Sequence, residues 1–215
     1  MTKSGLLNII SNKDFDQDKV VSKIIRQPGL ISDLIEGLKH VKARIKFGCA
    51  KLLRKISTQK SDLLYPQIDF FIEQLSNDNN ILKWNAIFII ANLAAVDKNN
   101  KIENIFDLYF SPITGPVLIT AANTIKSAAE IALAKPDLTD KITNEILKVE
   151  NAKYQTDECC NIALGHAIKS FDQFFEQISD KKPVIELIKR QTNNSRNATK
   201  KKAEKFLKKH DKNFN

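Results

Sequence analysis

A short helical pattern recurs along this chain at intervals of 35 to 39 residues, and it constrains the fold more than any other feature. The segment 84–90 aligns with 47–53 after a shift of 37 residues and with 119–125 after a shift of 35. Further shifts of about 39 residues reach the segment around Cys160 and then a lysine-rich segment that ends near Lys209. Because stacked helix pairs repeat with this period, the pattern predicts a helical repeat array.

The clearest pair of helices is expected in the middle of the chain. Apolar residues at helical spacing predict a first helix over 63–75 and a second over 81–96, with a polar turn between them. Strand-like alternation is almost absent. We therefore predict an all-α fold, an α-α superhelix of about five stacked helix pairs. No long low-complexity linker interrupts the chain, so we expect a single repeat domain over residues 1–215.

Two helix starts carry candidate capping residues. Thr156 precedes Asp157 and Glu158, and this order suits an N-cap followed by acids in the first turn. Asn193 or Asn194 is the expected cap of the last helix. Pro66 is expected to bend or start its own helix, because proline cannot donate a backbone hydrogen bond.

Residues 63–95 resemble a HEAT repeat. In that family a turn with Asp precedes a hydrophobic–basic pair and an alanine-rich second helix, and Asp78, Leu82-Lys83 and Ala86 occupy those places. One copy earlier, Ile45-Lys46 and Cys49 show the same order. The resemblance to HEAT-repeat proteins implies an α-solenoid whose second helices line a concave face, and a role in binding proteins or nucleic acids.

Positive charge is unevenly distributed. The chain has 34 Lys and Arg against 25 Asp and Glu, a net charge of +9. Residues 181–215 contain twelve of these basic residues and three acids, which accounts for the whole excess. We expect this segment to be a basic C-terminal helix pair or cap. Residues 39–60 contain eight basic residues and no acid.

If second helices line a groove, equivalent positions of successive repeats form two columns along it. The same register then predicts a concave binding groove with lysines at both ends and polar groups in the middle: Lys51, Lys55, Phe88, Asn92, Asn123, Ser127, His166, Lys201 and Lys205. The alternative is that these residues are the solvated faces of amphipathic helices.

The C-terminal segment carries a second candidate surface, a basic patch of Arg196, Lys200, Lys202, Lys208 and Lys209. One interpretation is a polar outer face that keeps the end of a solenoid soluble. Another is loose attraction to phosphates, since lysines dominate and few aromatic residues lie among them. Attachment to an anionic membrane is a third, although the apolar stripe of this helix is thin.

No pattern of residues points to catalysis, so we expect no enzyme, metal or cofactor. The three histidines are scattered, and Cys159 and His166 are too far apart along one helix to share a metal ion. An alkylpurine DNA glycosylase-like enzyme is one alternative, but the residue one turn after Trp84 is Phe88 rather than an acid.

Three cysteines, two of them adjacent, give no disulfide framework and favour a cytoplasmic protein. No apolar run is long enough for a membrane span. We therefore expect a non-catalytic scaffold that binds another macromolecule through its concave face, a protein with an acidic surface. Sequence-independent nucleic-acid binding is the alternative.

Overall fold

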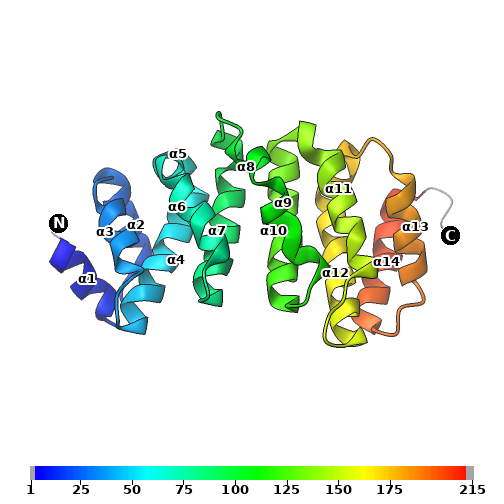
Figure 1. Cartoon of the computed structure of the whole chain (residues 1–215), viewed down its shortest axis with the longest axis horizontal. Coiled ribbons are helices and arrows are strands. Elements are labelled where there is room, and N and C mark those ends of the chain that lie inside the picture. The colour runs from blue at the N-terminus through cyan, green and yellow to red at the C-terminus, as the bar shows by residue number, and fades with distance from the viewer. Residues whose placement is uncertain (1–2, 212–215) are drawn as a thin grey trace. The chain divides into compact units, whose positions relative to one another are not determined.

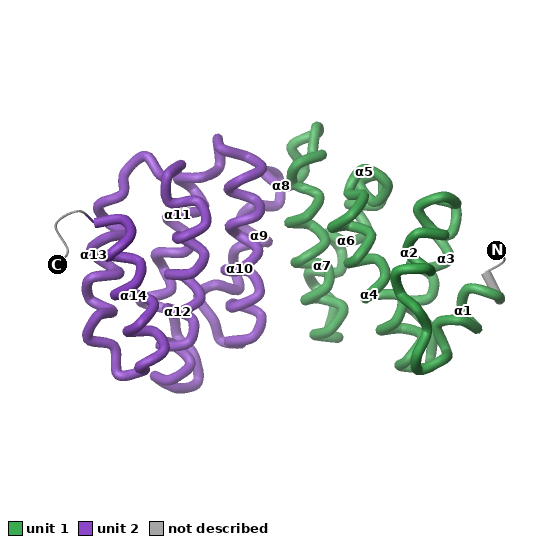
Figure 2. The backbone as a smooth tube through the Cα atoms, turned by 180° about the vertical axis from the view of Figure 1, so that it is seen from behind, with its two compact units in different colours: residues 1–101 green, residues 102–215 purple. Residues whose placement is uncertain are grey.

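The computed structural model describes residues 3–211 and is helical throughout, with no strand in that range. The chain forms two compact units, Met1–Lys101 and Ile102–Asn215 (Figure 2). Residues 212–215, the end of the predicted basic segment, lie outside the described residues. Each unit is described separately below.

Unit 1 contains short first helices and two long second helices (Figure 1). The two long helices, α4 and α7, pack against each other, and each packs against the short helices that precede it in the chain. A 3-10 turn over Tyr65–Gln67 separates α5 from α6. The helices of this unit are α1 Lys3–Ser11, α2 Gln17–Arg26, α3 Leu30–Gly37, α4 Ala43–Gln59, α5 Ser61–Leu64, α6 Ile68–Glu73 and α7 Asn80–Leu93.

The interface of α4 and α7 is the core of unit 1. Leu52, Leu53 and Ile56 of α4 and Ile90 of α7 are fully buried there. The start of α7 is fixed by Asn79, whose side chain accepts hydrogen bonds from the backbone N–H groups of the next helical turn. Burial of each large aliphatic side chain contributes roughly 1.5–3 kcal/mol, so this interface holds the two second helices in register.

Unit 2 contains three long second helices, α10, α12 and α14, each preceded by shorter helical segments. The helix α12 packs against both α10 and α14 and therefore forms the centre of the unit. The short helix α8 (Lys101–Asn104) lies at the boundary in the sequence. The remaining helices are α9 Phe106–Phe110, α10 Leu118–Ala134, α11 Thr139–Leu147, α12 Asp157–Phe174, α13 Lys182–Gln191 and α14 Asn197–His210.

Two polar contacts fix the position of α12 between its neighbours. The Ser170 hydroxyl donates to the Ile125 carbonyl of α10 at 2.8 Å. On the other side, the Thr199 hydroxyl of α14 donates to the Asn161 carbonyl at 2.7 Å. Both hydroxyl residues are almost fully buried, so these bonds form inside the core rather than in water.

The predicted all-α repeat architecture is confirmed. Unit 1 contains two helix pairs with second helices α4 and α7, preceded by α1 and α2, and unit 2 contains three pairs. The predicted second helix of the central pair is α7, with a final 3-10 turn over Ala94–Val96. The predicted first helix over 63–75 is divided at Pro66 into α5 and α6.

One of the two capping predictions is confirmed. The Thr156 side chain accepts from the Cys159 N–H at the start of α12. The last helix instead has Arg196 at its N-cap, and the Asn194 side chain accepts from the Arg196 N–H at 2.8 Å. Asn194 therefore orders the turn that leads into α14 but is not the cap itself. Within residues 3–211, no helix combines the length and the apolar character needed to cross a bilayer.

Candidate functional site

In unit 1, the predicted groove residues are mostly engaged with other parts of the same unit. The Lys55 ammonium lies 2.6 Å from a carboxylate oxygen of Asp18. The Asn92 amide donates to the hydroxyls of Ser57 and Thr58 at 2.8 and 3.1 Å. Lys51, by contrast, is exposed. The polar groups on this face therefore hold α2, α4 and α7 together.

Phe88 lies beneath a guanidinium group. The Arg54 Cζ atom is 3.5 Å from the centroid of the Phe88 ring, a cation–π contact between α4 and α7. Burial lowers the pKa of Arg54. Trp84, one turn before Phe88, is half-buried. Both aromatic rings of α7 are therefore partly covered.

In unit 2, the predicted groove residues differ in how far their side chains are exposed to solvent. Ser127 is 2% exposed and lies beside Tyr109, so it belongs to the core rather than to an open face. Most of the circumference of α10 is buried. More of its positions therefore lie in the core than the two predicted columns of groove residues assume. Asn123 and His166 are half-buried, whereas Lys201 and Lys205 are exposed.

The predicted basic patch is partly neutralised by acids of α12. Arg196 forms an ion pair with Glu158, and the Lys209 ammonium lies 2.7 Å from Asp172. Lys200 and Lys208 are exposed to solvent. The charges of the patch are therefore not equivalent: two serve to dock α14 on α12, and two face water.

Lys202 differs from the rest of the patch because it reaches inward. Its ammonium donates to the Gly165 carbonyl of α12 at 3.0 Å. Gly165 makes this approach possible: a Cβ at that position would lie 3.1 Å from the Lys202 nitrogen and 2.8 Å from the Thr199 hydroxyl oxygen. Since a helical carbonyl points toward the residue four positions later, the Lys202 ammonium lies along the turn that ends at Lys169.

His166 belongs to that same turn of α12. Burial lowers the pKa of His166, and the positive charges of Lys202, Lys169 and Lys126 lower it further. Burial also lowers the pKa of Lys202, as do the charges of Lys169 and Arg196. The charged neighbours that act on these two groups are therefore all cationic. We call His166, Lys169 and Lys202 the lysine–histidine cluster.

The sequence predicted two members of this cluster but did not bring them together. His166 belongs to the predicted groove and Lys202 to the predicted basic patch, whereas Lys169 and Lys126 belong to neither. Lys169 follows His166 by three residues, so the i, i+3 spacing on one helix was a usable signal. The contribution of Lys126 from α10 depends on how the helices pack.

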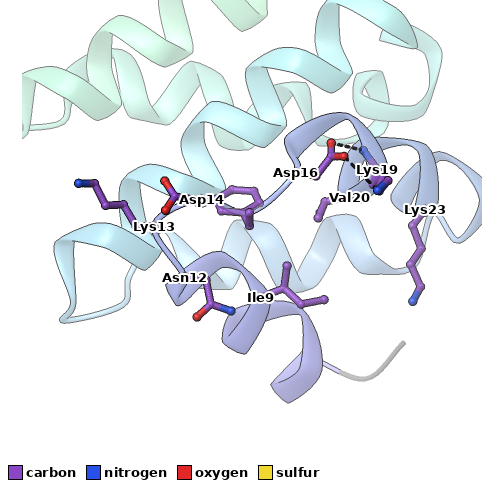
Figure 3. Close-up of a pocket in the computed structure, with 9 residues that line it drawn as sticks. Ile9, Asn12, Lys13, Asp14, Asp16, Lys19, Val20 and Lys23 are labelled. Atoms are coloured by element: carbon purple, nitrogen blue, oxygen red, sulfur yellow. Dashed lines mark hydrogen bonds and ion pairs between the residues drawn. The ribbon is translucent and has the colours of Figure 1, made fainter.

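A shallow pocket of about 580 Å³ lies between α1 and α2 in unit 1 (Figure 3). Ile9 and Val20 contribute apolar surface, and charges of both signs surround it. The carboxylate of Asp16 is engaged by the backbone N–H and the ammonium of Lys19. Three lysines and two aspartates line this pocket, so acids offset most of its positive charge, in contrast to the lysine–histidine cluster.

The described residues contain no group of three or more His, Cys, Asp or Glu side chains that could hold a metal ion. The three cysteines are free thiols, and burial raises the pKa of Cys49 to about 12. A thiol with so high a pKa is a poor nucleophile at neutral pH.

No protein-family model matches this sequence, and no curated protein sequence matches it at a significant level. Solved structures do match. A designed armadillo repeat protein superposes with a TM-score of 0.58 at 15% identity, covering 96% of this chain and 99% of that one. An engineered protein superposes with a TM-score of 0.55 at 13% identity, covering 97% and 96% of the two chains. The chain therefore has the fold of an armadillo/HEAT-like repeat solenoid.

Proposed function

We propose that this protein is a non-catalytic scaffold that binds an acidic segment of another protein on the second helices of unit 2. One observation carries this proposal: the Lys202 ammonium is held on the Gly165 carbonyl of α12, next to His166, and the charged groups that lower the pKa values of His166 and Lys202 are all cationic. Such an arrangement costs free energy in the unbound protein, and an anionic partner relieves that cost.

Other observations favour a binding role over a catalytic one. The repeat fold presents a series of second helices, and such stacks are used as extended binding surfaces. Most of the predicted groove residues of unit 1 contact other residues of the same unit, as in the ion pair of Lys55 with Asp18. This contrast favours unit 2 as the part that meets the partner. Free thiols at all three cysteines agree with a reducing, cytoplasmic setting.

A nucleic-acid partner is the second candidate, supported by exposed lysines on α14, among them Lys200, Lys201, Lys205 and Lys208. Phosphate-backbone binding requires several cations along one track. Arg196 and Lys209, which would extend such a track, are paired with Glu158 and Asp172. This pairing weakens the nucleic-acid interpretation and leaves the compact cluster as the stronger feature.

The test is a binding titration of the full chain with two fluorescent probes of about 20 units each, poly-L-glutamate and oligothymidylate, at about 50 and 300 mM NaCl. We expect poly-L-glutamate to bind at the lower salt concentration and to be released at the higher one. Absence of poly-L-glutamate binding at low salt would overturn the acidic-protein proposal. Tighter binding of oligothymidylate would replace it with the nucleic-acid candidate.

A further inference from the structure

The strongest unexplained feature of the molecule is the environment of one turn of α12. The Gly165 carbonyl accepts from the Lys202 ammonium, and the side chains of His166 and Lys169 leave the same turn. An ammonium group has three N–H donors, and the structure gives Lys202 one acceptor among the described residues. This turn therefore offers hydrogen-bond donors and positive charge together.

We infer that His166, Lys169 and Lys202 form one oxyanion site, which takes a carboxylate of an acidic peptide and at which His166 gains a proton as the peptide binds. This inference deepens the proposed function and rests on it, because it names the site and the chemical group that the partner supplies. A carboxylate has room for several donors, so it can accept from Lys202 and from a protonated His166 at once.

The geometry of this site depends on Gly165, which distinguishes it from a random group of surface lysines. A Cβ at this position would lie 2.8 Å from the Thr199 hydroxyl oxygen, whose hydrogen bond to the Asn161 carbonyl is partly buried. The glycine thus lets α14 approach α12 closely enough for Lys202 to reach the carbonyl. The side chain of Lys202 is held in place, and an ordered donor binds an anion at a lower entropic cost than a mobile one.

The charged groups around His166 explain why proton uptake accompanies binding. The elements packed around it contribute Lys126 from α10, Lys169 from α12 and Lys202 from α14, and all three disfavour its protonated form. A bound carboxylate places negative charge among them and favours the protonated form. Since binding and protonation are linked, the acidic peptide must bind more tightly as the pH falls through the titration range of His166.

Two acids of α12 are already engaged by residues of the C-terminal segment. Asp172 is engaged by Lys209 and by His210 at 2.7 and 2.8 Å. Glu158 is engaged by Arg196. Arg196, whose charge also lowers the pKa of Lys202, is thus itself paired with an acid, and the cluster keeps its net positive charge. A carboxylate from outside the chain is the group that fits this environment.

The first experiment is an NMR titration of His166, with and without poly-L-glutamate. We expect the titration of the His166 ring to move to higher pH when poly-L-glutamate is bound. If poly-L-glutamate binds but the titration of His166 does not move, the site is wrong while the proposed function stands. If poly-L-glutamate fails to bind while inorganic phosphate shifts the His166 titration, the oxyanion site stands and its acidic-peptide occupant is wrong.

The second experiment compares charge-matched variants of α14. Lys202→Gln should weaken poly-L-glutamate binding by about fivefold at low salt, because it removes a charge-assisted donor. Lys208→Gln removes the same charge from an exposed position and should change affinity less than twofold, about the effect of distant screened charge. Equal losses in the two variants would show diffuse attraction and overturn the site.

A third variant separates the histidine from the lysines. His166→Gln keeps a hydrogen-bonding side chain but cannot take up a proton. In this variant, poly-L-glutamate binding should lack the additional tightening that we expect of the full chain between about pH 7.5 and pH 6, a range in which glutamate side chains stay ionised. An unchanged pH dependence would show that another group takes up the proton.

Discussion

The second helices of the two units carry similar residues but use them differently. In unit 1, the polar and aromatic groups of α4 and α7 meet each other: Arg54 covers Phe88, and Asn92 donates to Ser57. In unit 2, the corresponding face of α12 and α14 brings the positive charges of Lys169 and Lys202 close to His166, whose pKa is lowered by burial and by those charges. A repeat position thus serves cohesion in one copy, while under the proposed function the equivalent face of another copy meets the partner.

The contrast is not one of total charge. Unit 1 contains 16 Lys and Arg against 10 Asp and Glu, whereas unit 2 contains 18 against 15. Unit 1 therefore has the larger excess of basic residues, yet Lys55 on its second helices is paired and Arg54 is stacked on an aromatic ring. The distinguishing feature of unit 2 is where its cations lie relative to its acids.

The largest expected effect tests cohesion in unit 1. Phe88→Ala removes the ring beneath Arg54 and should lower the free energy of unfolding by about 2–3 kcal/mol, since the ring is half-buried between two helices. Urea unfolding measures this loss, and Lys51→Ala is an exposed control on the same face. Loss of poly-L-glutamate binding without loss of stability would show that unit 1 meets the partner, which would reverse the comparison.

A smaller change of stability, with a clear change of binding, is expected at Gly165. Gly165→Ala brings a Cβ into the space used by Thr199 and Lys202, so stability should fall by a net amount of about 1 kcal/mol after the better helix propensity of alanine is included. Binding of poly-L-glutamate should fall with it. Gly29→Ala is the matched control in unit 1, because a Cβ there meets nothing within 4 Å. Retained binding in Gly165→Ala would contradict the requirement for close approach.

The third prediction concerns pH. The folded-state pKa of His166 lies below its ordinary value, so the unfolded chain binds this proton more readily and acid favours unfolding. The contribution of His166 to stability is present above the unfolded pKa of about 6.5 and is lost as the pH falls toward the folded value. His166→Gln should remove this part of the pH dependence in urea unfolding. A greater loss of stability on acidification in the variant would contradict the direction of the shift.

The smallest expected difference is between the unfolding midpoints of the two units. Trp84, the single tryptophan, reports on unit 1 by fluorescence, and His166 reports on unit 2 by NMR. If the repeats form one domain, the two probes should give the same midpoint in urea. Two separate midpoints would show that the units unfold independently.

The fold could be predicted from the sequence because its determinants are local and repeated. Apolar spacing located α7, and the order Thr156-Asp157-Glu158 located the start of α12. Breaks within a helix were harder to predict in detail. Pro66 produces a short 3-10 segment between α5 and α6 and not a simple bend. The Asn194 prediction was wrong by two residues because the turn uses its side chain before the helix begins.

The candidate site was only partly predictable, because it depends on distances between helices. The alignment of equivalent repeat positions selected His166, but it also selected Ser127, which lies in the core of unit 2. It could not indicate that Lys202 reaches α12 while Lys201 and Lys205, on the same helix, remain in solvent. That difference follows from the close approach at Gly165, which a single sequence does not reveal.

Gly165 also has a consequence for protein engineering. A designer who wished to graft this surface onto a regular repeat scaffold would naturally copy the side chains of His166, Lys169 and Lys202. Such a graft would lack the space in which the Lys202 ammonium reaches the helix carbonyl, since an alanine at the recipient position would occupy it. The transferable unit therefore has to include a residue with no functional group of its own.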